Sequence, residues 1–573
     1  MKTSTMKLGD LLTKNDPAFF IPPYQRKYEW TEEQCAVLLN DALKILASDP
    51  KEAPWHFFGT ALLSVSEESS ISDVRYVLID GQQRLTTVFL FLAACRDGGS
   101  CPRSLAKRIA SILFRSGFSR LEQSETDRGE YLKILSSPAS LEDGGRLWEN
   151  YLFFRREISG LSGSQPCLQD LAEAVLERFQ MVVLEPERRD GALQDIFESM
   201  NSVGIPLSFA DLARNWLLML PDSSAQKELF SSCWIPMEEA LEAGNDKDAS
   251  DFIRSYMEMK ACKSYLKPPF SGQPKPCYFE FKRIFSNSPK AALLEDLKIH
   301  ASLYSQLKTA QTPNTQANSI LQDLNAARAE AATPFLLLLF SMRQKGLLSD
   351  PDLLKILGAV RTYFLRRRLR GLPSGGAECD FANLSGRIGE LLKAKDKEEA
   401  AFALLSSQPK GLWLPNDAEL AERLKNKAFC SNNPKMQKFF LSLVEGKISR
   451  SHLNPEDPNL TIEHIMPQSL TQKWIEDLGE GADDAHSKLL DNIGNLAILP
   501  SDLNVQAGNK SFKEKKKIYA SQGGLQMTRS YITDRDKWDE GAILRRGEWI
   551  TEIFLRSILP LPQKYRNAQN FAA

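Results

Sequence analysis

Apolar and polar residues recur with short, regular periods along the first hundred residues of the chain. The apolar runs 57–65 and 75–79, joined by the serine-rich stretch 66–73, predict two strands. A helical period over residues 35–46 follows Thr31 and two acidic residues, which is typical of a capped helix start. After the second strand, Asp80-Gly81 turns the chain into a further helix over residues 82–95. This segment therefore predicts a mixed α/β unit.

Helical periods dominate the rest of the chain. We predict one more strand at 179–184, and a helix, turn and helix over 193–220 that is broken at Gly204-Ile205-Pro206. The predicted class is a multidomain α+β protein, mostly helical. Its expected parts are an α/β domain at 1–238, a helical domain at 239–445 with a buried helix in 334–342, a linker at 446–459, and a last domain at 460–573 closed by a helix in 537–559.

Composition limits the function without naming it. The chain has 573 residues, enough for several domains, and a formal net charge of −1, so any contact with nucleic acid must come from local patches. Its nine cysteines are scattered without a CxxC pair, which argues against a zinc ribbon or a disulfide framework. We find no secretory leader and no apolar run of bilayer length, so we expect a soluble cytoplasmic protein with no membrane partner.

Residues 460–512 hold the most specific chemistry. Glu463 precedes His464, which places a hard oxygen ligand for a divalent cation beside a general base. Asn504 adds a second oxygen donor, and we expect Asn495 to orient the imidazole through a side-chain hydrogen bond. Oxygen donors favour Mg²⁺ or Mn²⁺ over Zn²⁺. Whether Glu463 or the nearby Asp491 is the carboxylate ligand stays open.

This pattern resembles the His-Asn-His (ββα-metal) nuclease family, in the variant whose last histidine is replaced by asparagine. The resemblance covers about the last fifth of the chain and implies metal-assisted phosphodiester hydrolysis, with His464 taking a proton from water. Lysines that follow the motif directly are candidates for phosphate contact, namely Lys510, Lys513, Lys515, Lys516 and Lys517. We expect no ligand role for His300, His452 or His486, the last in a polar loop.

A second group of polar residues lies near the N-terminus. Gln25-Arg26 and the run Asp80-Gly81-Gln82-Gln83-Arg84 each place an arginine beside side-chain amides. The run sits between a predicted strand and a predicted helix, where backbone N–H groups bind anions and Arg84 can clamp a phosphate. Asp80 is placed to coordinate a metal or orient a water. We therefore predict a pocket for a nucleotide or a phosphodiester at this turn. It is not a P-loop, because no GxxxxGK[ST] motif occurs in the sequence.

These residues resemble the ParB/sulfiredoxin-like domain with a DGQQR motif found in GmrSD-type, modification-dependent (type IV) restriction enzymes. The likeness continues at 56–59, at 196–207, and at Asp211, Leu212 and Asn215. It implies an N-terminal domain that binds and hydrolyses a nucleoside triphosphate (ATP, GTP or UTP) and senses modified DNA. The implied nucleotide site is Asp80, Gly81, Gln82, Gln83 and Arg84 with Gln25 and Arg26 opposite, and with Glu198, Asn201 and Asp211 as weaker members.

The same resemblance implies that the C-terminal domain cuts or nicks double-stranded DNA, such as phage DNA with glucosylated hydroxymethylcytosine. Phosphorothioate-sensing defence nickases share the two-domain plan and are the alternative. A degenerate nuclease that only binds DNA, and a nuclease that cuts RNA, are further alternatives. The oligomeric state, a homodimer included, stays open.

Several residues have a structural interpretation beside the functional one. Tyr24, Tyr28 and Trp30 either stack on a base or pack in a core. Residues 201–204 either belong to the pocket or end a helix, with Asp211 capping the next one. Arg366, Arg367 and Arg368 form either a solvated helix face, the commoner case, or a DNA contact.

Overall fold

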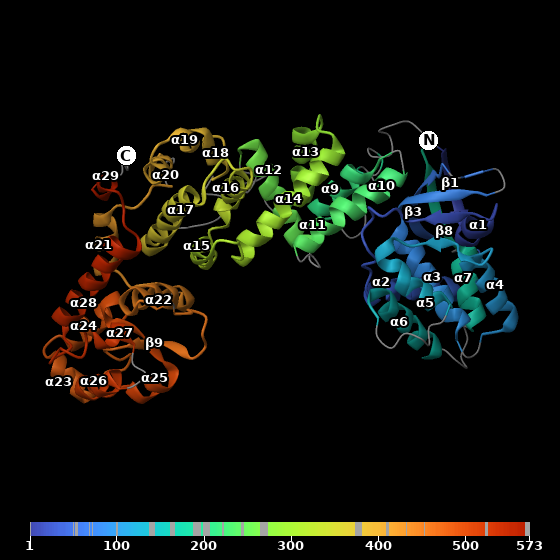
Figure 1. Cartoon of the computed structure of the whole chain (residues 1–573). Coiled ribbons are helices and arrows are strands. Elements are labelled where there is room, and N and C mark those ends of the chain that lie inside the picture. The colour runs from blue at the N-terminus through green and yellow to red at the C-terminus, as the bar shows by residue number, and fades with distance from the viewer. Residues whose placement is uncertain are drawn as a thin grey trace. The chain divides into compact units, whose positions relative to one another are not determined.

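The structure is a computed structural model of the whole chain (Figure 1). It describes all residues except 1, 50, 52–54, 68, 71–72, 99–100, 137–143, 161–166, 187–195, 197, 199–206, 221–222, 242–245, 264–272, 373–380, 408–411, 431–432, 452, 522–524 and 568–573. The chain forms two compact units. Unit 1 comprises Met1–Glu239, Ala243–Ser250 and Pro274–Lys298, and unit 2 comprises Ala240–Glu242, Asp251–Gln273 and Ile299–Ala573.

Unit 1 is built on a six-stranded mixed sheet with the order β1-β8-β3-β4-β2-β7. Its strands are β1 (Lys2–Lys7), β2 (Ala18–Phe20), β3 (His56–Val65), β4 (Arg75–Asp80), β7 (Leu121–Glu122) and β8 (Phe179–Glu185). The pairs β1–β8 and β3–β4 are antiparallel, whereas β3–β8, β2–β4 and β2–β7 are parallel. A separate two-stranded ladder joins β5 (Phe114–Arg115) and β6 (Phe118–Ser119).

The helices of unit 1 gather mainly on one side of this sheet, where α2, α3, α5, α6 and α7 are seen in Figure 1. They are α1 (Leu8–Thr13), α2 (Glu32–Ala47), α3 (Gln82–Arg96), α4 (Arg103–Leu113), α5 (Glu125–Ser136), α6 (Arg146–Gly160), α7 (Leu168–Arg178), α9 (Phe209–Leu218), α10 (Ser223–Leu229), the π-helix η2 (Phe230–Trp234), α11 (Ile235–Ala240) and α13 (Pro274–Phe285). Helices α12 (Asp246–Ala261) and α14 (Lys290–Thr309) are divided between the two units.

Alternation along the central strands gives the sheet two apolar faces. Ala61 and Leu63 of β3 and Leu78 of β4 belong to the large core under the helices. The intervening Leu62 and Ile79 belong to a small second core on the other face. This is the two-residue period of a strand covered on both sides, and it buries the end of β4 where Asp80 lies.

Unit 2 is mostly helical and includes the last domain. Its remaining elements are α15 (Thr315–Ala326), η3 (Glu330–Ala332), α16 (Thr333–Gln344), α17 (Asp350–Arg370), α18 (Ala382–Ser385), α19 (Ile388–Lys393), α20 (Lys397–Ser406), α21 (Asp417–Asn426), α22 (Pro434–Ser449), β9 (Leu460–His464), α23 (Gln472–Leu478), α24 (Ala482–Leu489), η4 (Ile493–Asn495), β10 (Leu496–Pro500), α25 (Ser501–Ala507), α26 (Phe512–Ala520), α27 (Gln526–Arg529), α28 (Glu540–Ile553), η5 (Phe554–Ile558) and α29 (Gln563–Arg566). No helix in the described ranges is long and apolar enough to cross a bilayer.

A ββα motif forms the centre of the last domain. Strands β9 and β10 pair antiparallel, with His464 opposite Leu496 and Glu463 opposite Ala497, and α25 follows β10 directly. The apolar residues Leu496, Ala497, Ile498 and Leu499 of β10 are fully buried. Burial on both sides explains why the sequence of β10 is a continuous apolar run.

Local signals predicted many elements closely. The helix cap expected at Thr31 is present at the start of α2, and Gln34 completes it as a capping box. The strands predicted at 57–65, 75–79 and 179–184 correspond to β3, β4 and β8. The first part of the predicted linker, residues 446–449, instead continues helix α22. The first helix and turn of the segment 193–220 fall largely outside the described residues, and its second helix is α9.

The arginine cluster of α17 proved different from both interpretations offered for it. Arg366 and Arg367 have no exposed surface. Arg366 donates to the carbonyls of Pro415 and Leu559 and pairs with Asp417. Neither a solvated face nor a DNA contact is therefore formed by these two residues. They tie α17 to the segment before α21 and to the C-terminal segment after η5.

Candidate nuclease and nucleotide sites

His464 is the last residue of β9, and its ring is paired with a carboxylate that sequence spacing did not assign to it. His464 Nε2 lies 3.1 Å from Asp491 Oδ1. An ionised carboxylate only accepts hydrogen bonds, so Nε2 carries the hydrogen and donates it. The other ring nitrogen, Nδ1, then keeps its lone pair and is the basic atom of this histidine. The His464 side chain is 15% exposed and that of Asp491 37%, so the pair lies at the surface of the domain but is partly shielded.

Asn495 does not touch the imidazole, contrary to expectation. It is fully buried, and its Oδ1 accepts from Met466 N at 2.7 Å and from Trp538 Nε1 at 3.2 Å. Its Nδ2 donates to Met466 O at 3.0 Å and to Leu490 O at 2.9 Å. Both donors and the acceptor of this amide are thus used on the framework. Asn495 ties the backbone just after His464 to the backbone just before Asp491.

Glu463 points into the domain and is only 3% exposed. Its Oε1 accepts from Lys515 Nζ at 2.7 Å and from Tyr519 Oη at 2.5 Å. Lys515 also donates to His464 O at 2.8 Å, and burial lowers the pKa of this lysine. One carboxylate oxygen is therefore committed to α26, while Oε2 makes no hydrogen bond with any described residue.

Asn504, the other expected ligand, sits on α25 against the same strand. Its Nδ2 donates to Thr461 Oγ1 at 2.8 Å and to Ile462 O at 3.0 Å, which leaves its Oδ1 without a partner among the described residues. Alternation along β9 puts the Thr461 and Glu463 side chains on one face, so both expected ligands approach that face. An oxygen from each suits a cation that keeps most of its waters, as Mg²⁺ does. Within the described ranges, no group of three or more His, Cys, Asp or Glu side chains is arranged to hold a metal ion, so a cation here would depend on this sparse ligand set.

The lysines after the motif divide into two groups. Lys515 is fully buried, so the expected phosphate contact is wrong for this residue. Lys516 donates to Arg535 O and lies over the Phe512 ring, and it is only half exposed. Lys510 and Lys513 are exposed, as is Lys517. These three remain available to a phosphate backbone.

Helix α28 packs against η4 and β10 and supports the site, a contact that the spacing of the motif did not predict. Gly494 of η4 lies so close to α28 that a Cβ added there would be 1.9 Å from Ile543 O. Arg546 of α28 is buried and donates from Nη1 to Gly494 O at 2.8 Å and to Leu496 O at 2.7 Å. Burial lowers the pKa of Arg546 to about 10. The glycine of the motif is thus needed for helix packing against the strand that pairs with β9.

In unit 1, the Asp80–Arg84 run forms the expected strand, turn and helix start. Gly81 caps α3 with a positive φ of 98°, and a Cβ there would be 3.1 Å from Thr60 O. Burial raises the pKa of the Asp80 carboxyl above its ordinary value, and nearby Arg84 and Arg26 oppose that shift. Arg84 crosses β3 at Gly59, where an added Cβ would be 2.7 Å from its Nε. A half-buried acid thus lies at the N-terminus of α3 within the electrostatic influence of Arg84 and Arg26, and Arg26 is itself paired with Glu29 at 2.9 Å.

Most side-chain amide groups of this motif form hydrogen bonds with the backbone of the loop that contains residues 26–29. Gln83 Oε1 accepts from Glu29 N at 2.9 Å, and Gln83 Nε2 donates to Lys27 O at 3.1 Å. Gln25 Nε2 donates to Ile79 O at 2.8 Å. Gln82 Nε2 donates to Arg26 O at 3.0 Å, but its buried Oε1 has no partner among the described residues. Gln25 and Gln83 thus attach the loop to β4 and α3. Gln82 Oε1 remains an acceptor without a partner among the described residues.

Tyr24 and Tyr28 belong to the core, so of the two interpretations offered for them core packing is correct. Both are buried, and Tyr28 Oη bonds Thr87 Oγ1 at 2.7 Å and accepts from Asn150 Nδ2 at 3.0 Å. Burial raises the pKa of each phenol. Large aromatic side chains with a satisfied hydroxyl are ordinary core residues.

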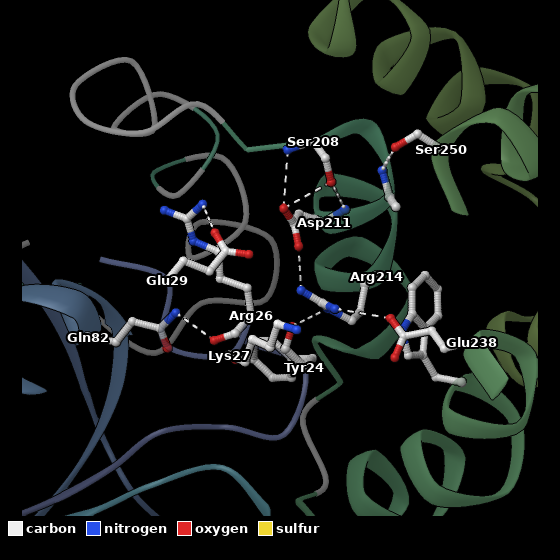
Figure 2. Close-up of polar contacts among 12 residues, drawn as sticks. Tyr24, Arg26, Lys27, Glu29, Gln82, Ser208, Asp211, Arg214, Glu238 and Ser250 are labelled. Carbon is white, nitrogen blue, oxygen red and sulfur yellow. Dashed lines mark hydrogen bonds and ion pairs between the residues drawn. The ribbon is translucent and has the colours of Figure 1, made fainter. Parts of the chain in front are cut away.

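Arg214 of α9 links the same loop to the helices that follow (Figure 2). Its Nε donates to Tyr24 O at 2.8 Å, and its other nitrogens pair with Asp211 and with Glu238. Asp211 also caps α9 by accepting from Ser208 N at 3.1 Å. The capping interpretation of Asp211 is therefore correct, whereas Arg214 was not singled out from the sequence.

The remaining candidates have structural partners or cannot be described. Glu198 accepts from Tyr278 Oη at 2.5 Å and from Lys282 Nζ at 2.9 Å, so it is held by α13. His300 is buried beside Ser341 Oγ, and His486 lies on helix α24 rather than in a loop, with Nε2 2.9 Å from Pro467 O. Asn201 and His452 lie outside the described residues.

A ββα motif whose histidine contacts a carboxylate, joined in one chain to an α/β domain with an Asp-Gly-Gln-Gln-Arg turn, is the pattern of a class of two-domain nucleases. Two family models agree with this class. The model of the GmrSD restriction endonuclease N-terminal domain matches residues 8–218, and that of the GmrSD C-terminal domain matches residues 414–553.

The chain belongs to the GmrSD family of type IV restriction endonucleases and carries both domains in a single polypeptide. It is a DNA endonuclease that acts on modified DNA. A search of curated proteins gave no significant match.

Proposed function

We propose that the chain cuts modified phage DNA by metal-assisted hydrolysis at His464, under the control of a nucleoside triphosphate bound in unit 1. The observation that carries the nuclease part is the 3.1 Å contact between His464 Nε2 and Asp491 Oδ1. Because Nε2–H is engaged by Asp491, Nδ1 is available to take a proton from a water at the phosphodiester.

Glu463 and Asn504 are the residues we assign to a divalent cation. Each has one side-chain oxygen without a hydrogen-bond partner in the described parts of unit 2, and both approach one face of β9. Mg²⁺ or Mn²⁺, when bound, polarises the scissile phosphate and stabilises the leaving oxygen. Lys515 keeps Glu463 in place, because a buried carboxylate without a partner would be strongly disfavoured.

Lys510 and Lys513 are assigned to the DNA backbone beside this site. Both are exposed, and they lie immediately before and within the first turn of α26, the helix whose Lys515 holds Glu463. Their contacts would be independent of sequence, since phosphate contacts position a duplex without reading its bases.

The nucleotide part rests on the start of α3. Backbone N–H groups at a helix N-terminus bind phosphate, and Arg84 with Arg26 adds positive charge. Asp80 is placed to orient a water or a cation at the phosphates, and the free Oε1 of Gln82 offers one acceptor to the ligand. These features support a triphosphate but do not select among ATP, GTP and UTP.

A cleavage assay tests both parts. The wild type, His464→Ala and the control His486→Gln are incubated with Mg²⁺, each triphosphate in turn, and three DNAs: unmodified, glucosylated at hydroxymethylcytosine, and phosphorothioated. We expect the wild type and the control to cut the glucosylated DNA, and His464→Ala not to cut. Full cutting by His464→Ala would refute the nuclease assignment.

The other arms of the assay separate the finer points. Cutting only of phosphorothioated DNA would replace the base modification by a backbone one. Loss of cutting in EDTA, restored by Mg²⁺ or Mn²⁺, is the expected metal dependence. Asp80→Ala should abolish triphosphate hydrolysis, and unchanged hydrolysis in that variant would refute the nucleotide site.

A further inference from the structure

Asp491 and His464 are 27 residues apart in sequence and meet only through the hairpin of the last domain. The 3.1 Å contact joins Asp491 Oδ1 to His464 Nε2. Neither side chain has another hydrogen-bond partner in the described parts of unit 2. The carboxylate is more exposed than the ring, and His464 is its one hydrogen-bond partner among the described residues.

The backbone around Asp491 is held firmly. Phe429 N donates to Asp491 O at 2.8 Å. The next residue, Asn492, is buried, donates from Nδ2 to Lys425 O at 3.0 Å, and accepts from Gly494 N at 2.8 Å. The preceding carbonyl, that of Leu490, accepts from Asn495. The backbone that carries the Asp491 carboxylate is thus held in place on both sides of the residue.

Asn495 joins this segment to the histidine. The same Nδ2 that donates to Leu490 O also donates to Met466 O, and Met466 lies two residues after His464. One buried amide therefore sets the distance between the backbone that carries the carboxylate and the backbone that carries the ring. The motif asparagine acts on the histidine through the main chain, and the direct contact is left to Asp491.

We propose that Asp491 is the positioning residue for the base His464, and not a metal ligand. The carboxylate holds the ring in the form with hydrogen on Nε2 and keeps Nδ1 turned to the attacking water, as the third group of a nucleophile–histidine–carboxylate arrangement does. This inference rests on the proposed function of His464 as the base. The divalent cation would be bound by Glu463 and Asn504, which approach one face of β9.

Asp491 would assist the hydrolysis of the phosphodiester, in which His464 is the base. A proton passes from the attacking water to Nδ1 of His464, and the water oxygen forms a bond to phosphorus. The bond from phosphorus to the leaving sugar oxygen breaks, and that oxygen takes a proton from solvent. The positive charge that forms on the ring is stabilised by the adjacent Asp491 carboxylate.

The test is the steady-state kinetics of Asp491→Asn and Asp491→Ala in the full chain, on the DNA that the wild type cuts. Asparagine keeps the size of the side chain but removes its charge, and its amide can donate to the ring and favour the wrong tautomer. We expect kcat to fall on the order of 10²-fold in both variants, as for other groups that orient a reacting side chain. KM for DNA and the Mg²⁺ concentration at half-maximal rate should not change. Asp483→Asn, an exposed carboxylate on α24, is the matched control and should retain full activity.

The outcomes separate this inference from the proposed function. A higher Mg²⁺ requirement in Asp491→Asn would make Asp491 a ligand and overturn the inference, as would a wild-type kcat. Cutting that persists in His464→Ala would overturn the proposed function and the inference together. Thermal unfolding of each variant, expected to match the wild type within a few degrees, shows that a lower kcat does not arise from misfolding.

Discussion

Gly494→Ala is the substitution whose effect follows most directly from the structure. The added Cβ would be 1.9 Å from Ile543 O and 2.8 Å from Gly547 N, and both are backbone atoms of α28 that no rotamer change can move. To restore an ordinary contact of about 3.5 Å, the helix must retreat from η4 by about 1.5 Å. The site depends on this approach, because η4 carries Asn495.

Two energetic terms follow from that retreat. Overpacking of a close contact costs about 1–3 kcal/mol. Arg546 is buried and donates to Gly494 O and Leu496 O, and each buried partner left unpaired costs about 1–3 kcal/mol. The expected loss is therefore about 3–9 kcal/mol, comparable with the roughly 5–15 kcal/mol that keeps an ordinary domain folded.

Urea denaturation followed by tryptophan fluorescence measures this loss in the full chain, with calorimetry to separate the transitions of the two units. Gly358→Ala is the matched control, because that glycine lies within α17 of the same unit and an added Cβ meets nothing within 4 Å. There we expect a gain of about 0.5–1 kcal/mol from helix propensity. A Gly494→Ala variant within 1 kcal/mol of the wild type would refute the packing argument.

Three further predictions concern charge and hydrogen bonding. Asp80→Asn should raise the unfolding temperature of unit 1 at pH 7. Burial raises the folded-state pKa of Asp80, so the charged form opposes folding above that pKa, and the gain should vanish as pH falls below about 4 in a series of thermal melts. Asn495→Asp should destabilise unit 2 by about 2–4 kcal/mol in urea, because a carboxylate cannot donate to Met466 O and Leu490 O; an unchanged midpoint would contradict the framework role. Arg214→Met should cost unit 1 about 3–5 kcal/mol, because it leaves the buried Asp211 without its cation, and a variant as stable as the wild type would show that Asp211 needs no partner.

The sequence by itself was sufficient for features that depend on neighbouring residues. The apolar periods of β3, β4 and α3 and the Thr31–Gln34 capping box are local, so their prediction needed no knowledge of the fold. The resemblance of residues 460–512 to ββα-metal nucleases was likewise enough to expect His464, Asn495 and Asn504 on one ββα motif. The pattern of apolar residues also placed the Asp80–Arg84 run between a strand and a helix.

Tertiary structure alone decided what each polar side chain contacts. Asp491, and not Asn495, touches the His464 ring, and Lys515 is buried on Glu463 rather than exposed to DNA. Arg366 likewise looked like a surface charge and is fully buried. The reason is physical: a buried donor or acceptor must be satisfied by whatever group packing brings beside it, and that group can lie anywhere along the chain. Residue type and spacing identify which groups can do chemistry, but only the packed structure determines which of them are committed to the framework and which remain free to react.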